Sequence, residues 1–347
     1  GPRERLYYDP GKVKCAIVTC GGLCPGINDV IRAIVMQACH GYGAASVLGI
    51  RYGLEGFIPA CRHDVMELTP LSVSDIHSFG GTVLGSSRGP QDVGEIVDAL
   101  ERLNVSMLFV IGGDGSMKAA SAIWGEVFRR GLHISVIGIP KTIDNDIAIT
   151  DHTPGYGSAA KYIASTLLEI GHDTSIYPIN SVTIVEIMGR DAGWLTGAAA
   201  LARNTYNDAP HLIYLPEVAF NKDEFIEDVK AAMDKYNNVV VAVSEGIKDA
   251  DGNYISATNA VEDTFGHSQL SGTGKCLEYI VKESIQVKVR SVEINILQRS
   301  AAHMSSITDI GEAFRLGRHA VECAIAGKTG IMVTTIRKDN EPYSVDM

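Results

Sequence analysis

The chain has 347 residues, of which 46% are hydrophobic, and its formal net charge at pH 7 is -11. This length supplies core for one large α/β domain or two smaller ones, and the acidic balance argues against nucleic acid as the main partner, because phosphate backbones require a basic face. No stretch approaches the ~20 apolar residues of a membrane span, and the polar start GPRERLYYDP lacks the apolar core of a signal peptide. We therefore expect a cytoplasmic protein.

Apolar runs alternate with amphipathic segments in the first part of the chain. Strands are predicted at residues 14–19, 45–50, 106–111 and 133–139, and helices at 28–38, 93–103 and 119–131. The alternation of strand and helix favours a parallel, doubly wound sheet.

A second set of elements begins near residue 156. Strands are predicted at 182–188, 211–216, 238–246, 288–297 and 330–336, and helices at 158–170, 195–202, 221–236, 271–285 and 309–327. The pattern predicts two α/β lobes, residues 1–152 and 153–347, with the chain returning to the first lobe near 300–325.

The cysteines form no recognisable metal motif. Their number is odd, Cys20 and Cys24 do not form a CxxC pair, and no His-x-x-His cluster accompanies them. We expect reduced thiols, with a zinc site as the alternative. The seven positions are Cys15, Cys20, Cys24, Cys39, Cys61, Cys276 and Cys323.

Two glycine-rich loops follow predicted strands, where ligands bind in open parallel sheets. CGGLCPGIND at 20–29 leads into a helix whose N-terminus attracts phosphate, although an ordinary strand–helix turn is the alternative. GGDGSMKAA at 112–120 surrounds Asp114 with glycines that suit a nucleotide phosphate. A carboxylate among phosphates needs a cation, so Asp114 is a candidate Mg²⁺ ligand. The alternative is a turn aspartate that bonds its own loop.

Two further loops carry charge. In PKTIDND at 140–146, Asp144 and Asp146 share a face if the segment is extended, and one of them can act as a general base toward a hydroxyl. The alternative is an Asx-rich turn. In IMGRDAG at 187–193, Arg190 suits a phosphate or sugar hydroxyl, or else pairs with Asp191 at the surface. Together the loops predict Mg²⁺-dependent phosphoryl transfer to a charged acceptor.

The sequence resembles the phosphofructokinases through CGGLCPGIN, LGSSR, GGDGS, PKTIDND, MGRDAG, LPE and LQR, in this order along nearly the whole chain. GPRERLYY, TCGGLCPG and PKTIDND are similar to the branch found in plants, trypanosomatids and many bacteria. The resemblance implies two Rossmann-like lobes with mostly parallel sheets and an active site in the cleft between them. It also implies phosphorylation of fructose 6-phosphate at its 1-hydroxyl, and a homodimer or homotetramer. The first lobe would bind nucleotide and Mg²⁺, and the second the sugar phosphate.

The resemblance implies a role for each matched residue. Asp144 is the implied base, Thr142 contacts the transferring phosphoryl group, Asp146 supports the site, and Asp114 binds Mg²⁺. The implied donor-phosphate contacts are Gly22, Arg88, Gly113, Gly115 and Ser116. The implied substrate contacts are Lys141, Met188, Gly189, Arg190, which also serves catalysis, Glu217, Arg290 and Arg299.

The chain departs from compact bacterial members at two positions. They carry an arginine that reaches into the neighbouring subunit's sugar-phosphate site where this chain has Ser181, and a histidine where it has Ile296. Contacts to the 6-phosphate therefore remain open, with His303 as a candidate replacement.

Two positions that separate donors in this family disagree here. Gly115 leaves room for the α-phosphate of ATP, whereas an aspartate there would exclude it. Lys141 stands where pyrophosphate users have lysine and compact bacterial ATP users have glycine. The branch that this chain resembles combines the same glycine and lysine, so we expect ATP, with pyrophosphate as the alternative.

Two other protein classes compete with this interpretation. Diacylglycerol-kinase-like and NAD-kinase-like proteins share a GGDG loop but lack PKTIDND and MGR in this order. A regulatory subunit that binds sugar phosphate without turnover would usually lose an acid that this chain retains at Asp114, Asp144 and Asp146.

Overall fold

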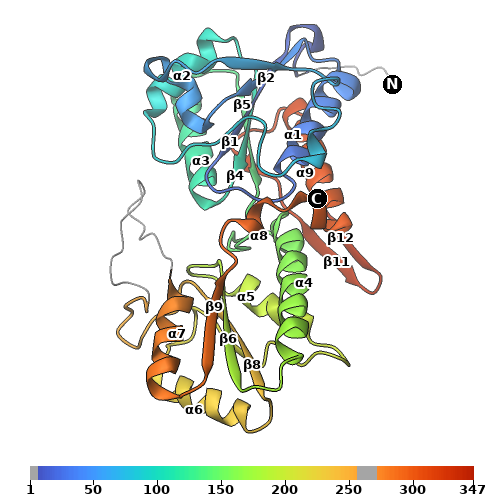
Figure 1. Ribbon diagram of the computed structural model, residues 1–347. Coiled ribbons are helices and arrows are strands. Elements are labelled where there is room, and N and C mark those ends of the chain that lie inside the picture. The colour runs from blue at the N-terminus through green and yellow to red at the C-terminus, as the bar shows by residue number, and fades with distance from the viewer. Residues whose placement is uncertain (1–6, 256–271) are drawn as a thin grey trace. The chain divides into compact units, whose positions relative to one another are not determined.

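The computed structural model describes residues 7–255 and 272–347 of the chain. The chain forms two compact units, one made of Gly1–Gly157 with Ser305–Met347 and the other of Ser158–Met304 (Figure 1). The first residues of the GPRERLYY stretch and the first residue of the helix predicted at 271–285 lie outside the described residues.

The first unit is built on a six-stranded sheet in the order β10-β5-β4-β1-β2-β3. Its strands are β1 (Lys14–Cys20), β2 (Ser46–Ile50), β3 (Val65–Leu68), β4 (Met107–Gly112), β5 (Ser135–Pro140) and β10 (Ile331–Met332). All neighbours pair in parallel except β2 and β3. The central strands β1, β4 and β5 are almost entirely buried, which explains why they are continuous apolar runs in the sequence. The predicted α/β class with mostly parallel strands is confirmed.

The main helices in the described part of this unit are α1 (Ile27–Met36), α2 (Val93–Arg102), α3 (Asp114–Arg129) and α9 (Ile307–Ile325). Leu100 of α2 and Ile123 of α3 pack with the β-strand residues Val18, Val110 and Val136 in one buried cluster. Asp92 caps α2 by accepting a hydrogen bond from the Glu95 backbone N–H at 2.9 Å.

The C-terminal part of the chain packs with the first unit. A methyl group on Gly317 of α9 would meet the Val30 carbonyl oxygen of α1 at 2.8 Å, so glycine permits close helix packing there. β10 extends the first sheet beside β5. The predicted second lobe includes the residues after 325, whereas all of 305–347 lies in the first unit. The division between the units falls after Gly157 rather than after residue 152.

A hairpin of β11 (Ile336–Asn340) and β12 (Tyr343–Asp346) follows and was not predicted. Tyr343 donates a hydrogen bond to Glu312 of α9 at 2.5 Å, and Arg337 pairs with Asp151 at 2.9 Å. His152 lies between these acids, 2.8 Å from Asp151 and 2.6 Å from Glu312. These hydrogen bonds and ion pairs hold the hairpin against Asp151 and His152, which follow the PKTIDND loop.

The second unit holds a four-stranded, all-parallel sheet in the order β7-β8-β6-β9. Its strands are β6 (Ser181–Ile187), β7 (Leu212–Tyr214), β8 (Asn238–Ser244) and β9 (Lys288–Glu293). Its helices are α4 (Tyr156–Ser175), which starts at the boundary, α5 (Trp194–Ala198), α6 (Lys222–Met233), α7 (Thr273–Ser284) and α8 (Leu297–Ser300). Ile184 and Val241 of the sheet pack with Phe225 of α6 and Leu277 of α7.

The remaining helical segments among residues 7–255 and 272–347 are short. They are η1 (Pro10–Lys12), η2 (Gln37–Tyr42), η3 (Gly53–Phe57), η4 (Pro59–Cys61), η5 (Ile76–Ser78), η6 (Ala199–Ala202) and η8 (Ala302–Met304). None of the helices in the described part of the chain has the length and apolar character needed to span a membrane.

Candidate active site

Three loops leave the first sheet at the same level. Cys20 at the end of β1 is in register with Gly112 at the end of β4, and Gly112 is in register with Pro140 at the end of β5. The CGGLCPGIND, GGDGS and PKTIDND loops therefore start side by side at the carboxyl edge of the sheet. This is the edge where parallel sheets bind ligands.

The glycines of these loops divide into two kinds. A methyl group on Gly112 would lie 2.2 Å from the Ser116 hydroxyl and 2.5 Å from the Cys20 carbonyl oxygen, so this glycine is required by packing. Gly22 and Gly115 have no neighbouring atom within 4 Å of such a methyl group among the described residues. Their backbone is therefore accessible to a ligand.

The LGSSR loop is fixed against the same edge. Ser86 donates a hydrogen bond to the Gly21 carbonyl at 2.7 Å, and the Gly21 N–H donates to the Ser87 carbonyl at 3.3 Å. Ser116 in turn donates to the Cys20 carbonyl at 3.2 Å. These bonds place Arg88, an exposed residue, directly after a loop held beside the GGDGS turn.

Asp114 is the first residue of α3, where a carboxylate interacts favourably with the helix dipole. It forms an ion pair with Lys118 at 2.7 Å, and its side chain is 60% exposed. The hydrogen bond to Asp114 and the negative charge of its carboxylate raise the pKa of the Lys118 ammonium. An exposed carboxylate oxygen beside an open helix N-terminus fits a Mg²⁺ ligand, provided that Lys118 moves aside.

Thr142 and Asp144 lie together in the PKTIDND loop. The Asp144 N–H donates to the Thr142 hydroxyl at 3.2 Å, and that hydroxyl lies 3.4 Å from the Asp144 carboxylate. A methyl group on Gly113 would lie 3.8 Å from Thr142, so this pair borders the GGDGS turn. The loop brings the implied base close to the implied donor loop.

The two aspartates of PKTIDND do not lie on an extended segment. Asn145 between them has a φ of 55°, in the left-handed region, and its side chain accepts a hydrogen bond from the Thr153 N–H at 2.8 Å. Asp146 beyond this turn is exposed, whereas Asp144 is half-buried. The shared face expected for an extended segment is therefore absent.

Lys141 points into the interior of the first unit. The residue is 1% exposed, and its ammonium donates to the Pro25 carbonyl and lies 3.5 Å from the Cys24 sulfur. Burial raises the pKa of the Cys24 thiol to about 12 even though the nearby lysine opposes this shift. The buried lysine thus stabilises the CGGLCPGIND turn through its hydrogen bond to the Pro25 carbonyl.

The carboxyl edge of the second sheet brings another set of loops together. Ile187 at the end of β6 is in register with Ser244 at the end of β8, and Glu186 is in register with Glu293 at the end of β9. β7 ends beside β8 and leads to Glu217. The MGRDAG, LPE and LQR stretches all follow these strand ends.

Polar side chains hold the backbone of the MGRDAG loop. Glu245 accepts a hydrogen bond from Gly189 N–H at 3.2 Å, and Glu217 accepts one from Gly193 N–H at 2.6 Å. The buried Gln298 accepts one from Met188 N–H at 3.3 Å. Glu217 is therefore engaged in fixing the loop.

Arg190 lies at the centre of this loop. A methyl group on Gly246 would lie 1.8 Å from the Arg190 carbonyl oxygen, so the Arg190 backbone is tightly enclosed. Its Nε atom is buried and has no hydrogen-bond acceptor among the residues that the structure describes. A buried guanidinium N–H that lacks an acceptor favours an anionic ligand at this point.

Arg290 lies apart from the other residues of the second unit. It is in register with Thr183, well before the carboxyl end of the sheet, and donates hydrogen bonds to Thr183 at 3.1 Å and Asp173 at 2.6 Å. It lines a surface pocket with Ser181 and Lys288. The other predicted residues of this unit follow the strand ends instead: Met188, Gly189, Arg190, Glu217 and Arg299.

The family profile described as Phosphofructokinase matches residues 14–324. The chain belongs to the phosphofructokinase family. It is 35% identical over 348 residues to a Borreliella burgdorferi protein named ATP-dependent 6-phosphofructokinase, covering 96% of this chain and 76% of the relative. It is 36% identical over 344 residues to Arabidopsis thaliana ATP-dependent 6-phosphofructokinase 4, chloroplastic, covering 96% and 63%.

A solved structure is similar along almost the whole chain of this phosphofructokinase. The pyrophosphate-dependent phosphofructokinase from Marinobacter aquaeolei superposes with a TM-score of 0.85 at 29% identity, covering 96% of this chain and 81% of that chain. The match to the family profile confirms the resemblance to the phosphofructokinases, and the Arabidopsis thaliana relative confirms the resemblance to plant members.

Two residues that hold the MGRDAG loop of this phosphofructokinase, Gln298 and Glu245, were not predicted as site residues. Gln298 stands inside the LQR motif and Glu245 at the end of an apolar run, so both carried a positional signal. Of the two departures from compact members, Ser181 lines the pocket beside Arg290 and Ile296 is 55% exposed. His303, the candidate replacement, lies edge-on to Tyr162 with ring centroids 6.4 Å apart.

Proposed function

We propose that this phosphofructokinase transfers the γ-phosphoryl group of ATP to the 1-hydroxyl of fructose 6-phosphate, giving fructose 1,6-bisphosphate. The observation that carries the proposal is the open N-terminus of α3. Gly115 has free space around it, beside a glycine-rich turn and the Thr142–Asp144 pair. Helix N-termini and exposed backbone N–H groups bind phosphate.

Asp144 is the proposed general base. In this reaction the 1-oxygen forms a bond to the γ-phosphorus, the bond from that phosphorus to the β–γ bridging oxygen breaks, and the hydroxyl proton passes to the Asp144 carboxylate. The Thr142 hydroxyl, which accepts from the Asp144 N–H, lies where it can donate to the transferring group. Asp146 supports the loop, and Arg88, Gly22, Gly113 and Ser116 surround the donor phosphates.

Asp114 is the proposed Mg²⁺ ligand, because an exposed carboxylate suits this cation. Bound Mg²⁺ offsets the repulsion between the anionic donor and the acidic loops. Lys118 would then exchange its carboxylate partner for solvent or phosphate.

The sugar phosphate is assigned to the loops of the second unit. The Arg190 guanidinium has a buried N–H available for an oxyanion, and Met188, Gly189, Glu217 and Arg299 complete the proposed set. Arg290 lies too far back along β9 to join them. We assign it to the site of a neighbouring copy, in line with a homodimer or homotetramer.

Two features favour ATP over pyrophosphate. Gly115 leaves space at the donor loop, and the ammonium of Lys141 is turned toward Pro25 rather than toward a ligand. Lys141 in this place is a structural support of the turn. Relatives named ATP-dependent 6-phosphofructokinase cover nearly the whole chain, although the solved structure of a pyrophosphate-dependent enzyme is also similar.

The test is an assay of the purified chain with fructose 6-phosphate, Mg²⁺ and either ATP or pyrophosphate, with the bisphosphate product identified. Turnover with ATP supports the proposal, and turnover with pyrophosphate alone overturns the donor assignment. Binding of fructose 6-phosphate without product from either donor would favour a regulatory subunit.

A further inference from the structure

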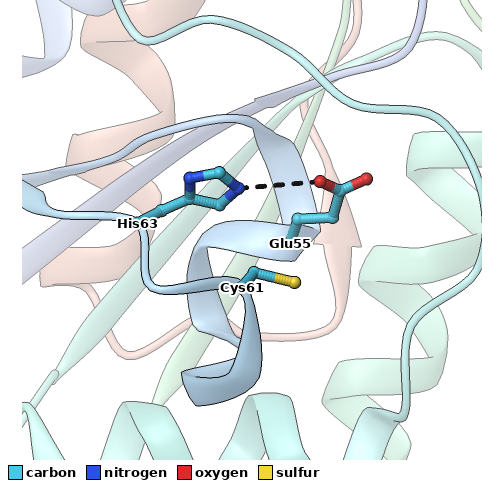
Figure 2. Close-up of side chains that lie close together, drawn as sticks. All are labelled: Glu55, Cys61 and His63. Carbon is cyan, nitrogen blue, oxygen red and sulfur yellow. Dashed lines mark ion pairs between the residues drawn. The ribbon is translucent and has the colours of Figure 1, made fainter.

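Glu55, Cys61 and His63 form a cluster in the first unit that the proposed reaction does not use (Figure 2). Each residue offers one ligand atom, and these atoms all lie within 4.8 Å of one another. The His63 Nε2 and Glu55 carboxylate are 3.6 Å apart. In residues 7–255 and 272–347, no other group of three His, Cys, Asp or Glu residues brings its ligand atoms this close together.

The backbone of the cluster is held by consecutive turns. Glu55 belongs to η3 and Cys61 ends η4, and the Ile58 N–H donates to the Glu55 carbonyl at 2.9 Å while the Cys61 N–H donates to the Ile58 carbonyl at 3.0 Å. Arg62 has a φ of 55°, so the chain turns sharply between Cys61 and His63. This turn places both side chains toward Glu55.

The ring of His63 is also oriented by packing. It lies against Tyr52 with ring centroids 4.6 Å apart and planes inclined at 46°. The Nε2 atom then points to the Glu55 carboxylate, as the dashed line in Figure 2 shows. An imidazole fixed in this way does not need to reorganise to bind a cation.

We propose that Glu55, Cys61 and His63 bind Zn²⁺, with water as the fourth ligand. Sulfur, imidazole nitrogen and carboxylate oxygen are ligands that zinc accepts together. Two ligand atoms at ordinary zinc distances are about 3.3–3.8 Å apart in a tetrahedral site, so the His63–Glu55 spacing already fits. Small side-chain rotations bring in the exposed Cys61 thiol, whose proton is released to solvent.

The ligand types also separate this site from Mg²⁺. Magnesium prefers oxygen ligands in octahedral geometry, whereas thiolate and imidazole select zinc and related transition metals. The Mg²⁺ of the phosphoryl-transfer reaction therefore does not compete here.

The cluster is connected to the LGSSR loop through Tyr52 and Gly53. The Tyr52 N–H donates to the Leu84 carbonyl at 2.8 Å, and a methyl group on Gly53 would lie 2.8 Å from the Ser87 nitrogen. Zinc bound beside Tyr52 stabilises these contacts between the cluster and the LGSSR loop. An effect of zinc on donor binding rests on the proposed function of the LGSSR loop. The proposal that Glu55, Cys61 and His63 bind zinc does not rest on that function.

The experiment titrates metal-free protein with Co²⁺, a coloured probe for zinc sites, and then displaces it with Zn²⁺. We expect one equivalent to bind with a thiolate-to-cobalt absorption band, and Cys61→Ser and His63→Gln to remove the band. The unfolding temperature should rise with Zn²⁺ concentration in the unmodified chain and stay constant in Cys61→Ser. Neither measurement needs catalytic activity, so failure here and failure of the proposed function are distinguishable.

His319→Gln is the matched control. His319 also has a cysteine and a glutamate nearby, but Cys323 lies at its Nε2 and Glu322 at its Nδ1, each 3.5 Å away, so one ion cannot join all three. We expect His319→Gln to keep the band. A band that survives Cys61→Ser, or no thiolate band in the unmodified chain, overturns the proposal.

Discussion

The carboxyl edges of the two sheets are built differently. At the first edge, Gly22 and Gly115 leave backbone open to a ligand, and the buried cation Lys141 is already engaged by the Pro25 carbonyl. At the second edge, Glu217 and Glu245 engage the backbone N–H groups of the MGRDAG loop. The Arg190 guanidinium there has a buried Nε–H that lacks an acceptor among the described residues.

Under the proposed function, this difference implies a separate mode of phosphate binding at each edge. The first edge suits a polyphosphate that contacts backbone N–H groups and a metal ion. The second edge suits a phosphomonoester that contacts arginine side chains. Substitutions at the two edges should therefore separate donor effects from acceptor effects.

Asp144→Asn should give the largest change, because it removes the proposed base from the first edge. We expect kcat to fall by about 10²–10⁴-fold, with the KM values for ATP and fructose 6-phosphate nearly unchanged. Steady-state kinetics with both substrates varied measures this. Asp98→Asn, on the exposed face of α2, is the control. Near-normal turnover in Asp144→Asn would remove this residue from the role of base.

Arg190→Ala should affect the acceptor rather than the donor. We expect kcat/KM for fructose 6-phosphate to fall by roughly 10²-fold, because an oriented cationic donor to the oxyanion is lost. The KM for ATP should stay within about twofold. Arg318→Ala, whose side chain pairs with Glu322 at the surface, serves as the control. An equal loss in ATP binding would contradict the division between the two edges.

Lys141→Met should change stability and leave donor preference unchanged. The substitution leaves the Pro25 carbonyl without its buried donor, which costs about 1–3 kcal/mol of unfolding free energy. Denaturant unfolding measures the loss, with the exposed Lys12→Met as the control. A switch in preference between ATP and pyrophosphate at unchanged stability would show that Lys141 contacts the donor.

His152→Gln should have the smallest effect, a loss of about 1 kcal/mol that depends on pH. Burial lowers the pKa of His152, but hydrogen bonds to Glu312 and Asp151 raise it above its usual 6.5 overall. Burial raises the pKa of Glu312, but its bonds to His152 and Tyr343 bring it below 4.5.

The sign of the pH effect follows from these two shifts. The histidine contribution is complete below pH 6.5 and is lost as pH rises through the raised pKa of His152. The glutamate contribution is complete above pH 4.5 and is lost as pH falls through the lowered pKa of Glu312. The stability difference between the unmodified chain and His152→Gln should be greatest between these values, and a pH-independent difference would contradict the assignment.

The strands were predictable because buried parallel strands are continuous apolar runs. β1, β4 and β5 lie where their sequences indicated, and the loops that follow them carry the predicted motifs. The hairpin of β11 and β12 was missed because β11 is exposed along its whole length and has no apolar alternation.

The direction of side chains was less predictable. Nothing in PKTIDND reveals that Lys141 turns inward, because a long side chain reaches either way from the same backbone position. The place of Arg290 depends on strand register, and the cluster at Glu55, Cys61 and His63 depends on two successive short helices. These are tertiary properties that a local pattern does not contain.

The most direct test of the donor assignment is the ratio of kcat/KM for ATP to that for pyrophosphate, measured in the unmodified chain and in Gly115→Asp. The open space at Gly115 predicts that the unmodified chain prefers ATP and that the new carboxylate lowers ATP turnover at least about tenfold by repulsion of the donor phosphates. A preference for pyrophosphate in the unmodified chain, or unchanged ATP turnover in Gly115→Asp, would contradict the account.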